Sequence, residues 1–290
     1  MSANAPLPAP PSLADTAARA RQLRALHGGG LVLPNAWDAL SARLLQEAGF
    51  PAIGTTSAGV AFALGHPDGQ VLPRAEALHA LGRMVAAVQV PVTADLEAGY
   101  GHRPPEVAAT VRAALDLGAA GLNLEDATGE PGAPLYPLAA QVDRLAAARG
   151  AAEAAGVPAY LNARTDTYFT GFGASAAERL HETVRRGRAY LQAGADSVFV
   201  PGVTDPATVQ ALRAGIGGPV AVMLLPGGPG APELLAAGAC RVSVGPGLLL
   251  AALGHVAQLA QALRTQGSFA PATALPFAQV QGWFSPAAGL

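Results

Sequence analysis

Acidic residues lie in two short segments whose spacing could support metal chemistry. Asp95 and Glu97 stand in "VTADLEAGYG", and Glu125 stands in "LNLEDATG". Each segment opens with an apolar run typical of a buried β-strand. Successive side chains of a strand point to opposite faces, so Asp95 and Glu97 are expected to share a face. Carboxylates on one face repel one another unless a cation or a proton is shared. A hard divalent ion such as Mg2+, which prefers oxygen ligands, is the expected solution.

A basic residue follows a third apolar run. Arg164 stands in "LNARTD", two positions after Asn162. Its planar guanidinium matches the geometry of a carboxylate, so it is predicted to bind a small acid. Aspartate or glutamate at a strand end can instead cap the next helix, and a single such residue is best explained that way. Acidic ends on neighbouring strands, together with an arginine, favour the functional interpretation.

The sequence repeats a pattern in which an apolar run is followed by an Ala/Leu-rich helical run. The polar residues described above stand at the ends of the apolar runs. Glycines such as Gly118 and Gly194 close the helical runs, as expected for helix C-termini. The predicted strands are 31–34, 52–55, 92–95, 121–125, 159–164, 197–200, 220–224 and 241–244. The predicted helices are 37–48, 74–88, 105–117, 138–155, 176–193, 206–214, 232–237 and 248–264.

Eight strands with crossover helices predict an α/β fold, namely a (β/α)8 TIM-type barrel with a C-terminal helical tail. An open doubly wound sheet is the alternative, but no Gly-x-Gly-x-x-Gly turn follows the first strand. The expected division is an N-terminal arm over 1–13, the barrel over 14–265 and the tail over 266–290. The acidic segments then fall at the carboxyl ends of the barrel strands, where such folds place their active sites.

Composition narrows the function classes. The chain is 51% hydrophobic and 13% charged with a net charge of -2, so it can bury a large core and shows no basic footprint for nucleic acid. Its single cysteine, Cys240, fits a reducing compartment. No secretory signal and no membrane span are indicated, so the cytoplasm is the expected location. Arg185, Arg186 and Arg188 are expected on a solvated helix face.

At the acidic segments the sequence resembles the isocitrate lyase/phosphoenolpyruvate mutase superfamily. The matching segments are "LPNAWDALSARLLQEAGFPAIGTTSAGVAFALGHPDG", "PVTADLEAGYG", "GAAGLNLEDATG" and "NARTD". They span residues 33–166, and the strand-helix pattern extends the match to about Gly254. The resemblance implies Mg2+, with Mn2+ as an alternative. It implies that Asp95 binds the metal directly or through water, and that Glu97 and Glu125 join the metal shell through water.

The resemblance also implies residues that bind the substrate, a small 2-oxo acid or dicarboxylate. Trp37 would lie against the substrate, Asp95 would also bind it, and Arg164 would pair with its carboxylate. Asp68, in "GHPDG", matches a loop carboxylate near the metal and is a candidate catalytic residue together with Arg164. The predicted cradle for the carboxylate consists of Thr56, Ser57 and Ala58.

Two departures from the superfamily pattern bear on the reaction. Its carbon–carbon lyases carry a Lys-Lys-Cys-Gly-His type segment after the fourth strand, but "ATGEPGAPLYPL" stands here. Its phosphonate-processing members place a histidine at the end of the sixth strand, where this chain has Val200–Pro201–Gly202. Cleavage of isocitrate or methylisocitrate and phosphoryl migration are both in doubt. Residues that could supply the proton transfer are His66, Asp68, His102, Glu130 and Tyr136.

The resulting hypothesis is a Mg2+-dependent lyase that acts on a small 2-oxo acid, or its adduct, through an enolate-like intermediate. The alternatives are an oxaloacetate-type decarboxylase or a phosphonopyruvate hydrolase/mutase-like enzyme, and a non-catalytic protein that binds a 2-oxo acid. The resemblance also implies a homo-oligomer, dimer or tetramer. The tail with Trp283 and Phe284 is expected to pack on a neighbouring subunit, although packing on its own barrel is the alternative.

Overall fold

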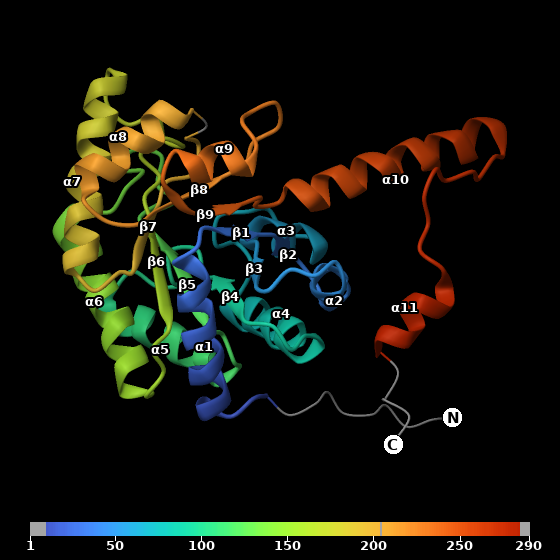
Figure 1. The fold of residues 1–290 in the computed structure, drawn as a ribbon, viewed down its shortest axis with the longest axis horizontal. Coiled ribbons are helices and arrows are strands. Elements are labelled where there is room, and N and C mark those ends of the chain that lie inside the picture. The colour runs from blue at the N-terminus through green and yellow to red at the C-terminus, as the bar shows by residue number, and fades with distance from the viewer. Residues whose placement is uncertain (1–9, 204, 285–290) are drawn as a thin grey trace. The chain divides into compact units, whose positions relative to one another are not determined.

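The computed structural model describes residues 10–203 and 205–284, and the chain divides into two units after Gly245. In the first unit, every strand pairs in parallel with its neighbours in one nearly closed barrel (Figure 1). The order is β1-β9-β8-β7-β6-β5-β4-β3-β2. The strands are β1 Leu31–Leu33, β2 Asn35–Ala36, β3 Ile53–Thr55, β4 Val92–Asp95, β5 Gly121–Glu125, β6 Tyr160–Arg164, β7 Ser197–Phe199, β8 Val220–Met223 and β9 Ala239–Ser243.

β1 and β2 are two halves of one stave of the barrel. Pro34 separates them and has no N–H to donate to a neighbouring strand. β1 pairs with β9, and β2 pairs with β3. The Asn35 side chain spans the join, donating to the Thr55 carbonyl at 2.7 Å and accepting from the N–H groups of Val244 and Gly245 at 3.0 and 2.9 Å. Nine strands therefore make eight staves, and the predicted (β/α)8 architecture is confirmed.

Helices follow the staves and cover the outside of the sheet (Figure 1). In the first unit they are α1 Leu13–His27, α2 Ala39–Glu47, α3 Ser57–Ala63, α4 Arg74–Ala87, α5 Pro104–Asp116, α6 Leu138–Ala154, α7 Ala176–Gln192, α8 Pro206–Ile216 and α9 Ala231–Ala236. The predicted helices agree with these to within a few residues. α1 and α3 were not predicted, because their Ala-rich sequences lack a clear apolar period.

Helix α1 packs at the amino-terminal end of the strands. Ser12 and Asp15 form its capping box, so the predicted arm over 1–13 runs into a helix, while residues 1–9 lie outside the described part. Leu23 is fully buried and lies so close to β5 that a Cβ on Gly121 would be 2.7 Å from its Cδ2 atom. His27 stacks on Tyr160 of β6 with ring centroids 3.7 Å apart.

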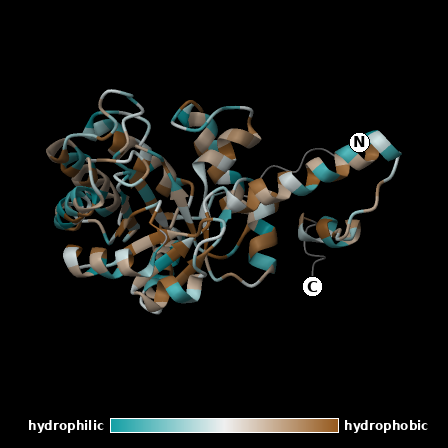
Figure 2. Ribbon diagram, turned by 90° about the horizontal axis from the view of Figure 1, so that it is seen from above, coloured by the Kyte–Doolittle hydropathy of each residue, from teal (hydrophilic) through white to brown (hydrophobic). Residues whose placement is uncertain are grey.

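The main hydrophobic core lies between the outward-facing strand residues and the surrounding helices. Val92 and Ala94 of β4 and Leu122 and Leu124 of β5 belong to this core with Leu115 of α5. Figure 2 shows hydrophobic residues along the strands of the first unit and hydrophilic residues on its outer helices. The intervening strand residues face the barrel interior, which fixes the direction of Asp95 and Glu125.

The second unit contains α10 Gly247–Gln266 and α11 Phe277–Phe284. α10 exposes several large apolar side chains, and so does α11: Leu248, Leu250, Leu253, Val256, Leu263, Phe277 and Phe284. Among the described residues, no helix is both long enough and apolar enough to cross a membrane.

Candidate active site

Asp95 ends β4 and has two carboxylate oxygens in different situations. Oδ2 accepts hydrogen bonds from the Ser57 N–H at 3.1 Å and the Ser57 hydroxyl at 2.9 Å. The Asp95 N–H donates to Thr55 Oγ1 at 2.8 Å, which fixes the backbone beside it. Oδ1 is buried and has no hydrogen-bond partner among the described residues. An unpaired buried oxygen is costly, so this atom suits a metal ion or a bound ligand.

Glu97 lies just beyond β4 in a backbone conformation that is unusual for its type. Its φ is 50°, and Gln70 and Tyr100 have φ values of 60° and 54°. These three residues bond to one another: the Gln70 N–H and the Tyr100 hydroxyl donate to the Glu97 carboxylate, and the Tyr100 N–H donates to Gln70 Oε1 at 2.8 Å. Left-handed backbone at non-glycine residues costs energy and clusters at functional sites. Burial, reinforced by the charge of Asp95, raises the pKa of Glu97 to about 7.

Glu125, at the end of β5, forms an ion pair with Arg164 at the end of β6. The Arg164 Nη1 atom lies 2.7 Å from Glu125 Oε2, and its Nε atom lies 2.6 Å from Asp166 Oδ1. Burial opposes the charge of Arg164, but the two carboxylates outweigh it and raise its pKa. Burial raises the pKa of Glu125 although Arg164 lowers it, and the charges of Asp166 and Asp95 add to the rise. The guanidinium of Arg164 therefore forms ion pairs with two carboxylates.

The charges around Asp95 do not balance. Asp68 is exposed in the loop after α3, and desolvation together with the charge of Asp95 raises its pKa. Asp95 also acts electrostatically on Glu97, Glu125 and Asp166. Arg164 pairs with Glu125 and Asp166, and its charge also acts on Asp68 and Asp95. An added cation would lower the repulsion among them.

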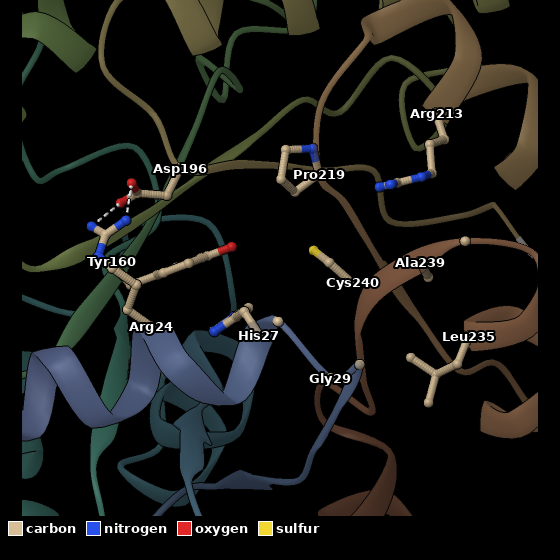
Figure 3. A pocket seen from close by; sticks show the side chains of 13 residues that line it. Arg24, His27, Gly29, Tyr160, Asp196, Arg213, Pro219, Leu235, Ala239 and Cys240 are labelled. Atoms are coloured by element: carbon tan, nitrogen blue, oxygen red, sulfur yellow. Dashed lines mark hydrogen bonds and ion pairs between the residues drawn. The ribbon is translucent and has the colours of Figure 1, made fainter.

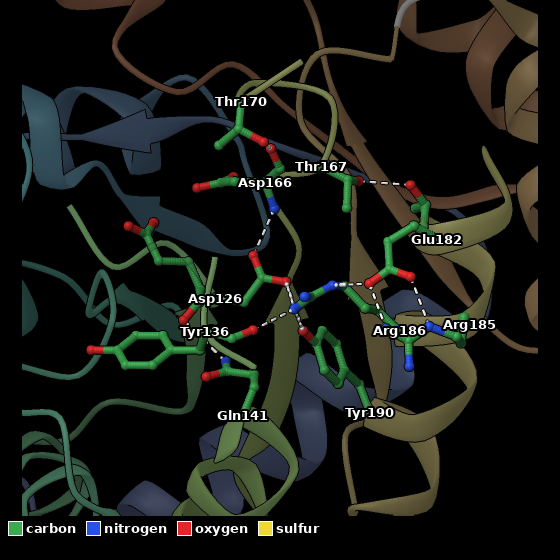
Figure 4. A network of polar contacts seen from close by, with 12 residues as sticks. Asp126, Tyr136, Gln141, Asp166, Thr167, Thr170, Glu182, Arg185, Arg186 and Tyr190 are labelled. Atoms are coloured by element: carbon green, nitrogen blue, oxygen red, sulfur yellow. Dashed lines mark hydrogen bonds and ion pairs between the residues drawn. The ribbon is translucent and has the colours of Figure 1, made fainter. Parts of the chain in front are cut away.

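A second buried network holds the ends of β5 and β6 in place (Figure 4). Asp126 is fully buried and accepts from the Asp166 N–H at 2.8 Å, the Tyr190 hydroxyl at 2.6 Å and Arg186 at 3.1 Å. Arg186 also pairs with Glu182 at 2.7 Å. The expectation that Arg186 lies on a solvated face is wrong, because α7 turns it toward β5. Glu182 four residues before Arg186 predicts a pair on the helix surface, so the spacing contained no signal that this pair is buried.

The residues of the predicted carboxylate cradle stand at the start of α3. Thr56 is its N-cap and accepts from the Gly59 N–H at 3.3 Å, so its hydroxyl is already engaged. Ser57 bonds to Asp95, and Ala58 is buried behind them. Trp37 lines a separate hollow of about 420 Å³ with Ala63, Leu64, His79 and Arg83. The structure thus brings Ser57 to the acidic cluster and places Trp37 in a neighbouring hollow.

The candidate proton-transfer residues are scattered. His102 Nδ1 lies 2.6 Å from the Tyr136 hydroxyl, and the Tyr136 ring lies under Arg144. Glu130 is exposed, and its N–H bonds to Thr128 within its own loop. His66 is half-buried, and its N–H bonds to the Ala61 carbonyl.

The acidic residues do not form a closed ligand set by themselves. Within the part of the chain that the structure describes, no three His, Cys, Asp or Glu side chains are grouped so that they could hold one ion. The carboxylates of Glu97 and Glu125 are engaged by Tyr100 and Arg164, which leaves Asp95 with the free oxygen. An ion that keeps several waters, as Mg2+ does, fits such a set better than one that needs a full protein cage.

Known proteins resemble the chain over most of its length. Residues 23–264 match the family model described as phosphoenolpyruvate phosphomutase. An oxaloacetate decarboxylase of Bradyrhizobium diazoefficiens is 32% identical over 85% of this chain and 85% of its own. The 2-methylisocitrate lyase of Escherichia coli K12 is 32% identical over 58% of this chain and 56% of its own.

Solved structures of related lyases and mutases also resemble the chain. A Burkholderia cenocepacia J2315 protein, provisionally assigned as a lyase/mutase, is 41% identical with a TM-score of 0.87, over 94% of this chain and 98% of its own. Oxaloacetate acetylhydrolase bound to oxalate is 25% identical with a TM-score of 0.82, over 91% of this chain and 93% of its own. The family match and the barrel agree with the predicted resemblance, and the chain belongs to the phosphoenolpyruvate phosphomutase family of the isocitrate lyase/phosphoenolpyruvate mutase superfamily.

Proposed function

We propose that this chain is a Mg2+-dependent carbon–carbon lyase, able to use Mn2+ as well, that acts on a small 2-oxo acid through an enolate. The observation that carries the proposal is the excess of carboxylates around the unpaired Oδ1 atom of Asp95, beside the guanidinium of Arg164. An acidic pocket with one arginine suits a cation and an anionic substrate together. Relatives named as lyases and decarboxylases support this class of reaction.

The proposed roles follow from the contacts of each residue. Asp95 would hold the ion through its free oxygen, while Glu97 and Glu125 would act on it through water. A divalent ion, when bound, supplies a Lewis acid that stabilises charge on the keto oxygen. Ser57 orients Asp95, and Arg164 would bind the substrate carboxylate. The sequence contains no lysine, so no lysine amine within it could form an imine with the keto group.

Within this class, decarboxylation of an oxaloacetate-type acid is favoured. The bond between the substrate's methylene carbon and its distal carboxylate breaks, and its electron pair moves into the enolate as CO2 leaves. The methylene carbon then takes a proton, which solvent can supply, so the step needs no cysteine acid. The loop after β5 has the sequence "ATGEPGAPLYPL", without Cys, Lys or His.

A panel of substrates tests the proposal. Purified protein with Mg2+ is offered oxaloacetate, pyruvate, 2-oxoglutarate, isocitrate and phosphonopyruvate, and the products are followed by NMR. Pyruvate and CO2 from oxaloacetate, above the rate with Mg2+ alone, are the expected products. Turnover of phosphonopyruvate would replace the proposal with hydrolase or mutase chemistry. Binding without turnover of any acid would indicate a non-catalytic 2-oxo acid binding protein.

We also propose that the protein forms a homo-oligomer, a dimer or a tetramer. The exposed apolar side chains of α10 and α11 support this, since such patches commonly mark protein interfaces. The C-terminal residues are proposed to pack on a neighbouring subunit. The cytoplasm stays the predicted compartment, on the basis of the single cysteine.

A further inference from the structure

A second cavity lies at the amino-terminal ends of the strands, the opposite end of the staves from Asp95. It measures about 570 Å³, within the range of small-molecule sites. Tyr160 begins β6, Asp196 precedes β7, Pro219 precedes β8 and Cys240 stands near the start of β9. The end of α1 and the Gly28–Gly30 segment form another side (Figure 3). None of the proposed active-site residues lines it.

The charge around this cavity is positive. Its one acidic lining residue, Asp196, is already paired with Arg24 at 2.6 Å and with Arg149 at 2.7 Å. Arg213 also lines the cavity and is exposed, and its guanidinium has no hydrogen bond or ion pair among the described residues. Asp196 therefore cannot balance the lining arginines.

A further cation is buried beside the cavity. Arg241 of β9, next to the lining residue Cys240, is 1% exposed. Its three guanidinium nitrogens have no hydrogen-bond partner in the described part of the chain. Its charge acts on His27, Tyr160 and Cys240, which all line the cavity. A buried, unpaired charge is costly, and a nearby anion would reduce that cost.

The lining leaves room for a ligand. The tripeptide Gly28–Gly30 presents backbone without side chains, and a Cβ on Gly29 would meet no atom within 4 Å. In Figure 3 the Tyr160 hydroxyl, the Cys240 thiol and the Arg213 guanidinium extend from three sides toward the open space. Hydroxyl and guanidinium donors suit the oxygens of an anion.

We propose that this cavity is a second ligand site, which binds a small oxyanion of the phosphate or carboxylate class through Arg213 and the positive field of Arg241. The site is separate from the proposed active site and does not depend on the reaction assigned there. Its volume exceeds that of a bare phosphate ion, so an organic phosphate or a polycarboxylate of similar charge fits the space.

The lone cysteine gives a local reporter of occupancy. Cys240 lines the cavity and is the chain's one cysteine, so alkylation by iodoacetamide, followed by mass spectrometry, reports on this site alone. Inorganic phosphate, glycerol phosphate and citrate are titrated separately against the alkylation rate of the full-length protein. At least one of them is expected to slow alkylation in a saturable way. Which of them protects identifies the phosphate or the polycarboxylate as the source of the oxyanion.

Two variants separate specific binding from general charge effects. Arg213→Gln is expected to raise the anion concentration needed for half-protection about tenfold or more, as loss of a charged hydrogen bond implies. Arg83→Gln removes another exposed arginine, on α4, and is expected to leave protection unchanged. Equal behaviour of both variants, or no protection by any of the three anions, would overturn the proposal.

Discussion

The two carboxylate oxygens of Asp95 have different roles. Ser57 binds one of its oxygens through both backbone and side chain, so the carboxylate cannot rotate freely. The other oxygen is buried and unpaired among the described residues. Glu97, two residues later, is bonded through both of its oxygens. The two acids of one motif therefore differ in role, which their spacing alone did not reveal.

Replacing Asp95 with Asn should weaken Mg2+ binding strongly. The amide can still accept from Ser57, but it removes the negative charge of the proposed direct ligand. Affinity measured by titration calorimetry is expected to fall by more than about tenfold, the smallest loss typical of outer-shell partners. Asp143→Asn, at an exposed position of α6, is the matched control and should bind as the wild type does. Equal Mg2+ affinity in the two variants would refute the metal assignment.

Glu97 should make stability depend on pH when metal is chelated. Its folded pKa of about 7 lies above the usual 4.5, so the folded state binds the proton more tightly than the unfolded state. Its contribution is present below pH 4.5 and is lost as the pH rises toward and through 7, by about 3 kcal/mol at most. Urea denaturation at several pH values should show this loss in the wild type and a smaller one in Glu97→Gln. Exposed Glu153→Gln is the control, and an unchanged slope in Glu97→Gln would contradict the assignment.

At the scale of elements, Asp126 joins the end of β5 to β6 and α7. It accepts from the backbone after β6 and from two side chains of α7. Arg164 and Glu125 lie next to Asp126 and Asp166, so their positions depend on the hydrogen bonds of Asp126. The buried pair of Asp126 and Arg186 thus supports the site, since loss of Arg186 would leave the buried Asp126 without a cationic partner.

Asp126→Asn is expected to destabilise the protein by about 1.5 to 3 kcal/mol, because the buried Arg186 loses one of its two carboxylate partners and keeps only Glu182. Asp116→Asn breaks the exposed ion pair with Arg112 instead, which should cost less than about 1 kcal/mol. Urea denaturation of both variants measures the difference. Similar losses in the two would mean that the Asp126 network contributes no more than a surface pair does.

The sequence predicted the elements whose pattern is local. Buried strands such as β5 read as continuous apolar runs, and a polar residue marks their carboxyl ends, so Asp95, Glu125 and Arg164 could be placed at strand ends in advance. Contacts between distant segments could not be predicted. The Asn35 side chain bonds to residues more than 200 positions away, and the side chain of Asp126 bonds to the segment after β6 and to α7. Helix α1 was missed because its sequence lacks a clear apolar period, and the close packing of Leu23 on Gly121 is another contact between distant segments.

At the scale of the molecule, the first unit places two polar sites at opposite ends of one set of staves. Acidic residues gather at the carboxyl ends, and arginines gather at the amino-terminal ends. The acidic end should take a cation and an acid together, whereas the other end should take an anion alone. Ligands of the two ends should therefore stabilise the fold independently of each other.

Thermal unfolding can test this independence. A ligand that binds only the folded state stabilises it by about 2.7 kcal/mol at 100 times its dissociation constant. Mg2+ with oxalate should raise the melting temperature of the wild type and of Arg213→Gln equally, and should fail to do so in Asp95→Asn. Oxalate without Mg2+ should have a smaller effect, because the carboxylates around Asp95 repel an anion that arrives without a cation. A full shift by oxalate alone, or a shift that survives in Asp95→Asn, would mean that the ligand does not bind through a metal at the acidic end of the barrel.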